Sequence, residues 1–131
     1  MSTVELPRDG VELGLPDTPP APDELLKLVA RTFPGIAEDR LVDIQVVAAQ
    51  LVGNAYRHAR APRRLRLRRG PGAELVRVEV EDASPSRFPV LGRLDTPAHG
   101  RGLLMVNRLA VNWGHQPRGD HKTVWAEVRL V

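Results

Sequence analysis

The sequence predicts an α+β fold, a two-layer sandwich in which about three helices pack on one face of a mainly antiparallel sheet. Apolar residues recur at helical spacing in some segments, whereas other segments alternate strictly between apolar and polar residues and are joined by turns rich in glycine and proline. The 131 residues suit a single core, and neither an internal repeat nor a linker divides them. We therefore expect one domain over residues 1–131, with residues 1–10 as a flexible N-terminal tail.

The N-terminal half predicts a strand followed by two helices. Residues 11–15 alternate and then meet a proline-rich turn, which favours a short strand. Pro22 suits the first position of a helix, and acidic residues follow it, so a helix is expected from Pro22 to just before Pro34. Residues 37–59 form the clearest helical pattern, with acidic residues near the start, basic residues near the end and an apolar face between them.

The middle of the chain predicts a hairpin and a long loop. Residues 64–68 alternate between arginine and leucine, a Gly-Pro-Gly turn follows, and valines at alternate positions mark a second strand that ends at Asp82. Residues 82–99 contain several prolines and no sustained period. A loop of about 18 residues in a compact domain is usually functional.

The C-terminal part predicts a third helix and a final hairpin. The helix opens at Gly100-Arg101-Gly102, and strands are expected over residues 111–116 and 123–131, with a turn between them. The inward face of the last strand would carry Val124, Ala126, Val128 and Leu130. We expect the two tryptophans, Trp113 and Trp125, to face each other as cross-strand or packing neighbours.

The composition excludes several classes of protein. The chain has no cysteine, which removes disulfides and thiolate metal sites. No apolar run approaches the roughly 20 residues of a membrane helix, and the N-terminus lacks the regions of a signal peptide. We therefore expect a soluble, cytoplasmic protein with no membrane partner.

A polar stripe runs along the long predicted helix. Gln50, Asn54 and His58 are each four residues apart, so they share one face of a helix whose neighbouring residues are apolar. Buried polar groups need partners. The stripe is either a ligand-facing surface or a partly exposed face whose side chains are satisfied.

Two further segments have both a functional and a structural interpretation. Asp82 ends a strand, where it either serves a site or forms a turn with its own backbone. Residues 99–103 lead from the long loop into a helix, and their glycines would let backbone N–H groups approach an anion, although glycines also begin helices for steric reasons. Neither a Walker A loop nor a dinucleotide fingerprint is present.

Taken together and in this order, the segments resemble the N-box, G1 box and G2 box of the gyrase and histidine-kinase type (GHKL) ATPases. The resemblance extends from about Val11 to the C-terminus, and it is closest to the bacterial anti-sigma-factor serine kinases and their small regulatory relatives. The motifs that carry it are Leu51-Val52-x-Asn54-Ala55-x-Arg57-His58-Ala59, Val80-x-Asp82-x-Ser84-Pro85, His99-Gly100-Arg101-Gly102-Leu103-Leu104, Trp113-Gly114 and Val124-Trp125-Ala126. The resemblance implies the histidine-kinase-like (Bergerat) fold, a left-handed βαβ sandwich.

The resemblance also implies a site for ATP and Mg²⁺. Asn54 would coordinate Mg²⁺ through its amide oxygen, Asp82 would accept from the adenine amino group with Thr123 near the same edge, and residues 84–99 would form a lid. The cofactor-binding residues that it implies are Asn54, His58, Asp82, Gly100, Arg101, Gly102, Leu103 and Thr123.

One position departs from the family pattern. The family places a glutamate, the general base, four residues before the N-box asparagine, and this chain has Gln50 there. An amide cannot take a proton, so losing the base could cost about 10²–10⁴ in rate while leaving the nucleotide bound. Gln50 is therefore a doubtful catalytic residue, although it could still orient a nucleophile.

Three functions remain open at this point. The first is an ATP-binding regulator that resembles an anti-sigma factor or a serine kinase acting on an anti-anti-sigma (STAS-type) partner. The second is a non-catalytic ATP-binding module that sequesters a sigma-like or acidic protein. The third uses the arginine run between Arg57 and Arg69 to bind nucleic acid. The only aromatic residue available for stacking beside that run is Tyr56, on the preceding helix, and an amphipathic edge strand explains the alternating arginines as well. The sequence leaves a homodimer open.

Overall fold

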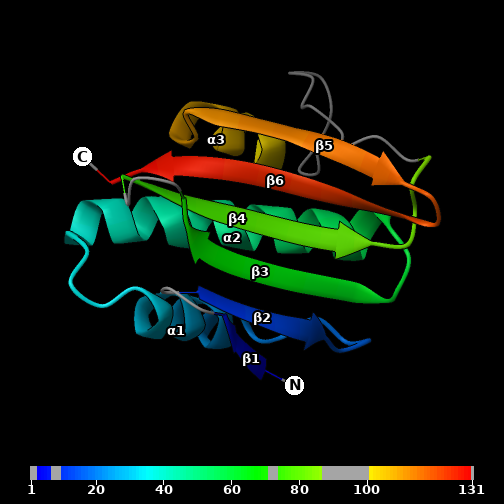
Figure 1. The fold of residues 1–131 in the computed structure, drawn as a ribbon, viewed down its shortest axis with the longest axis horizontal. Helices are drawn as coiled ribbons and strands as arrows, with labels where there is room; N and C mark the ends of the chain where they lie inside the picture. Colours follow the sequence, from blue (N-terminus) through cyan, green and yellow to red (C-terminus); the bar gives the residue numbers. More distant parts are fainter. Residues whose placement is uncertain (1–2, 7–9, 71–73, 87–100, 131) are drawn as a thin grey trace.

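The computed structural model describes residues 3–6, 10–70, 74–86 and 101–130, which form one antiparallel sheet covered on one face by helices (Figure 1). In the described residues the sheet has six strands in the order β1-β2-β3-β4-β6-β5. The strands are β1 (Thr3–Leu6), β2 (Gly10–Leu15), β3 (Arg63–Arg69), β4 (Leu75–Asp82), β5 (Asn112–Arg118) and β6 (His121–Arg129). The helices are α1 (Pro22–Thr32), α2 (Glu38–His58) and α3 (Arg101–Leu109). The predicted fold class is confirmed.

Local chemistry sets the ends of α1 and α2. Pro22 opens α1, and its first turn carries two acidic residues beside the positive end of the helix dipole. At the C-terminal end of α2, the Ala59 N–H donates to the Ala55 carbonyl oxygen. The Arg63 guanidinium also donates to that oxygen, at 3.1 Å, and to the Ala59 carbonyl oxygen, at 2.7 Å. None of the helices described here is long and apolar enough to cross a lipid bilayer.

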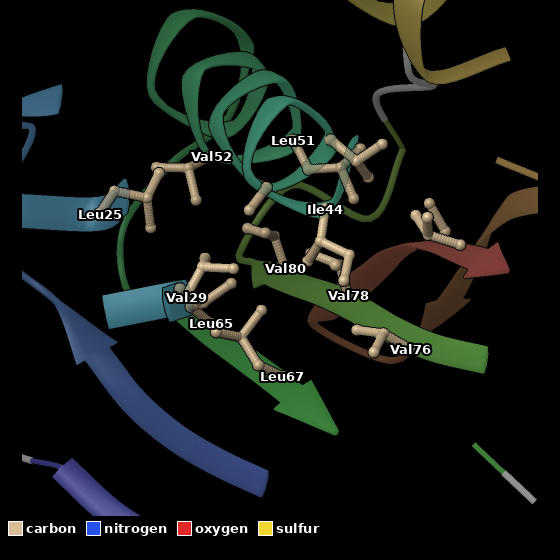
Figure 2. Close-up of a cluster of buried hydrophobic side chains, with 14 of the residues drawn as sticks. Leu25, Val29, Ile44, Leu51, Val52, Leu65, Leu67, Val76, Val78 and Val80 are labelled. Atoms are coloured by element: carbon tan, nitrogen blue, oxygen red, sulfur yellow. The ribbon is translucent and has the colours of Figure 1, made fainter. Parts of the chain in front are cut away.

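The core lies between α2 and the inner face of the sheet. Figure 2 shows Ile44 and Leu51 of α2 directed toward the valines of β4. As predicted, the inward residues of β4 and β6 alternate along each strand. These inward residues, all buried, are Val76, Val78, Val80, Val124, Ala126 and Val128.

The opposite face of the sheet carries a network of arginines and glutamates centred on Glu79 of β4. Arg66 donates to Glu79 at 3.1 Å and to Glu12 at 2.9 Å, Arg77 donates to Glu79 at 2.9 Å, and Arg68 adds a longer bond. Burial acts to raise the pKa of Glu79, but the hydrogen bonds from Arg77 and Arg66 and the nearby charges outweigh it, so this pKa lies below its usual value. The alternating arginines therefore occupy an amphipathic strand, as predicted, but β3 lies inside the sheet between β2 and β4 and not at its edge.

Two further expectations are corrected. Part of the expected N-terminal tail, Thr3–Leu6, forms β1 and pairs antiparallel with β2. The tryptophans lie on opposite faces of the hairpin, since Trp113 is paired with Ala126 and Gly114 with Trp125. Trp113 Nε1 donates to Asn107 Oδ1 of α3, at 3.0 Å, whereas Trp125 lies beneath the Arg77 guanidinium, which is 4.2 Å from a ring centroid.

Candidate functional site

The ends of α2 and β4 meet, which brings together two of the sequence motifs (Figure 1). The Ala83 N–H donates to the Arg60 carbonyl oxygen at 3.0 Å, and the Arg60 N–H donates to Ser84 Oγ at 2.9 Å. These two bonds hold the chain just beyond α2 against the chain just beyond β4. The polar stripe and Asp82 therefore belong to one end of the domain.

Asn54 is the unusual member of the polar stripe. Its side chain is 6% exposed, and its Oδ1 atom is buried without a hydrogen-bond partner among the residues that the structure describes. A buried acceptor left in this way costs about 1–3 kcal/mol. Such an oxygen suits a hard cation, which takes oxygen ligands. Asn54 therefore does not fit the interpretation of the stripe as a partly exposed face whose side chains all have hydrogen-bond partners.

Gln50 and His58 lie one helical turn to either side of Asn54, and both are half-buried. The stripe is thus deepest at its centre. Among the described residues, no group of three or more His, Asp or Glu side chains could hold a metal ion. A cation at Asn54 would take its other oxygen ligands from a bound molecule or from water, as Mg²⁺ commonly does in nucleotide sites.

Asp82 is held at the end of β4 by two donors. Its Oδ1 atom accepts from the Ser84 N–H at 2.8 Å and from Lys122 Nζ at 2.9 Å. The first bond is the local turn that the structural interpretation predicted, but the second joins β4 to β6. Asp82 is 1% exposed and Lys122 is 2% exposed, and Lys122 Nζ also donates to the Ser84 carbonyl oxygen at 3.0 Å.

Thr123 lies on the other face of the sheet from Asp82. The buried residues of β6 alternate, so Lys122 and Val124 face the helices, whereas Thr123 borders a shallow pit on the outer face together with Arg64 and Glu79. The polar residue of β6 that lies beside Asp82 is Lys122, which the sequence analysis did not single out. Part of the signal was present in the sequence, because Lys122 lies two residues before Val124 and so continues the inward face of β6. Its pairing with Asp82 follows from the strand register in the structure.

The glycine-containing motif is described only in part. Residues 87–100, which include Gly100 and most of the expected lid at 84–99, lie outside the described residues. Helix α3 begins at Arg101, so Arg101, Gly102 and Leu103 form its first turn, where backbone N–H groups have no partner within the helix. Helix α3 packs on α2, the helix that carries Asn54.

Comparison with known proteins agrees with this arrangement. The structure is similar to the crystal structure of the RsbU and RsbW domains of Rv1364c from Mycobacterium tuberculosis, with a TM-score of 0.67, 19% identity, and coverage of 92% of this chain and 32% of that one. It is also similar to the histidine kinase AdeS of Acinetobacter baumannii, with a TM-score of 0.50, 16% identity, and coverage of 91% of this chain and 67% of that one. No curated protein matches the sequence. The family model of the histidine kinase-like ATPase domain matches residues 17–127, and the chain belongs to this family.

Proposed function

We propose that this chain is a regulatory protein that binds ATP together with Mg²⁺. The observation that carries the proposal is the buried, unpartnered Oδ1 atom of Asn54. It stands on the helix that meets the end of β4, in a chain whose family is that of the histidine kinase-like ATPases. When bound, Mg²⁺ would neutralise part of the phosphate charge.

Each motif has a separate task in this proposal. Asn54 supplies an oxygen ligand to the cation, and His58 lies on the same stripe. The first turn of α3, with Gly100 just before it, binds the phosphates through backbone N–H groups and the positive end of the helix dipole. Asp82 accepts a hydrogen bond from the base.

Catalysis is the weaker part of the function, and the reason is Gln50. It occupies the position from which a general base would act, and its amide cannot remove a proton from an attacking hydroxyl or water. We therefore propose slow phosphoryl transfer at most. Binding energy would then order the protein around the nucleotide without rapid turnover.

The proposed partner is a cytoplasmic regulatory protein, either an anti-anti-sigma (STAS-type) protein or a sigma-like factor. The similarity of fold to the RsbU and RsbW domains of Rv1364c supports the anti-sigma branch. The alternative is a non-catalytic module in which bound ATP serves only to prepare the surface that sequesters its partner. Gln50 favours this alternative.

One experiment tests binding and separates the two forms of the proposal. The protein is titrated with ATP in the presence of Mg²⁺ and then incubated with it for hours, while ADP and phosphoserine on a candidate partner are measured. Binding without ADP supports the module, and phosphoserine supports the kinase. Absence of any ATP binding would reject both.

A further inference from the structure

We propose that Lys122 reads the base of the nucleotide alongside Asp82, so that two side chains of opposite charge recognise adenine. This inference rests on the proposed ATP site. It starts from the buried pair that joins β4 to β6, in which Lys122 Nζ lies 2.9 Å from Asp82 Oδ1. Both side chains are almost completely buried, and they stand on the face of the sheet that α2 covers.

Among the residues that the structure describes, the hydrogen bonds of this pair leave one acceptor and one donor unused. Both bonds to the Asp82 carboxylate fall on Oδ1, so Oδ2 accepts none from the described residues. An ammonium group has three N–H donors. Lys122 uses two of them, one for Asp82 and one for the Ser84 carbonyl oxygen. Asp82 Oδ2 and the third Lys122 proton can therefore serve a ligand.

This combination matches the edge of adenine. Adenine presents an N–H donor at N6 beside an acceptor at N1, so Asp82 Oδ2 would accept from N6 while Lys122 donates to N1. A carboxylate alone would satisfy only the amino group. Because charge-assisted hydrogen bonds are the stronger kind, Lys122 should contribute as much to base recognition as the carboxylate does.

Lys122 also donates a hydrogen bond to the Ser84 carbonyl oxygen. This bond joins the backbone just beyond β4 to β6. The Ser84 side chain accepts a hydrogen bond from the Arg60 backbone N–H, just beyond α2. Lys122 is thereby held in place by groups from two directions, so its third proton has a restricted orientation. A preorganised donor loses little side-chain freedom when it binds.

Nucleotide analogues test the proposal in the wild-type protein. Calorimetry would compare ATP, 1-deaza-ATP, which lacks the N1 acceptor, and 7-deaza-ATP, which keeps the N1 and N6 edge. We expect 1-deaza-ATP to bind at least about tenfold more weakly than ATP, since a hydrogen bond from a charged donor is lost. 7-Deaza-ATP should bind like ATP. Equal affinities for ATP and 1-deaza-ATP would overturn the proposal while leaving ATP binding intact.

The variant Lys122→Met then identifies the donor. It should bind ATP more weakly than the wild type and should no longer discriminate between ATP and 1-deaza-ATP. A discrimination that persists in the folded variant would mean that another group reads N1, and would reject the role of Lys122. Lys27→Met is the matched control, because the Lys27 side chain is 70% exposed on α1.

Removing one partner of a buried ion pair is strongly destabilising, so thermal melting must accompany the binding measurements. If Lys122→Met does not fold, the three analogues with the wild-type protein still decide whether the site reads N1, and equal affinities for ATP and 1-deaza-ATP would still reject the role of Lys122. A wild-type protein that binds none of the three nucleotides would reject the ATP site and this inference together.

Discussion

Glu79 is a charged residue on the open face of the sheet that is nevertheless only 6% exposed, because three arginines cover it. Its folded-state pKa lies below the ordinary value of 4.5, so the carboxylate stabilises the fold above that pH and loses this contribution as the pH falls through the folded-state pKa. We predict that Glu79→Gln lowers the free energy of unfolding by about 3 kcal/mol at pH 7. The difference from wild type should shrink below about pH 4.5.

Urea unfolding at several pH values checks this prediction, with the exposed Glu74→Gln as the control. A destabilisation that stays constant from pH 7 to pH 3 would show that Glu79 acts through packing and not through its charge.

Gln50 lies where a general base would act, and replacing it with glutamate tests whether it limits catalysis. Gln50→Glu restores a group that can accept a proton beside the proposed phosphates, so we expect phosphoryl transfer to rise by about 10²–10⁴. ATP affinity should change little, because Gln50 is placed to activate the nucleophile and not to hold the nucleotide. The measurement is ADP formation and partner phosphorylation in single-turnover conditions. Unchanged rates in a variant that still binds ATP would contradict this explanation of weak catalysis.

At the scale of the elements, β2 offers a matched pair of glycines. A Cβ atom on Gly10 would lie 2.8 Å from the Leu67 carbonyl oxygen of β3, which is backbone and cannot turn aside, whereas nothing lies within 4 Å of a Cβ atom on Gly14. We therefore predict that Gly10→Ala lowers the free energy of unfolding by about 1–3 kcal/mol. Gly14→Ala should be within about 1 kcal/mol of wild type. Chemical denaturation measures both, and equal effects would show that β2 moves freely relative to β3.

The long helix and the faces of β4 and β6 could be predicted because their periodicity reports burial directly. The periodicity does not predict which residue of the neighbouring strand each residue pairs with. A two-residue turn at 119–120, with Gly119 at a φ of 59°, joins the strands, which both extend further toward the turn than expected, and it sets the register of β5 against β6. A register shifted by one residue moves a side chain to the other face. The prediction that Trp113 and Trp125 are neighbours was wrong for this reason: in the observed register they lie on opposite faces.

Some residues of the candidate site could be predicted from the sequence, and others could not. Asn54 and Asp82 could be singled out from their spacing and their places at the helix stripe and the strand end. The alternation of β6 places Lys122 on the same face as Val124, but the pairing of Lys122 with Asp82 depends on the register between β4 and β6. The buried state of Asn54 Oδ1 is likewise a property of the packed structure and not of the helical period.

For the whole molecule, the distribution of charge bears on nucleic-acid binding. The sequence concentrates arginines between Arg57 and Arg69, yet the structure pairs Arg64 and Arg66 with Glu12, and Arg66 and Arg68 with Glu79. Phosphate contacts would have to compete with these bonds. We predict no steep salt-dependent binding to DNA or RNA, measured by fluorescence anisotropy from 50 to 200 mM salt. A fall of about 10³-fold or more in affinity over that range would contradict this prediction.

The central claim is that Asn54 Oδ1 completes a nucleotide site with Mg²⁺, and calorimetry of ATP binding with Mg²⁺ and with a chelator tests it most directly. The wild type should bind ATP more tightly with Mg²⁺, and Asn54→Ala should lose at least about tenfold of that gain. Asn112→Ala, the same change at an exposed position of β5, should behave like the wild type. An Asn54→Ala protein that is folded and binds Mg·ATP as tightly as the wild type would contradict the account.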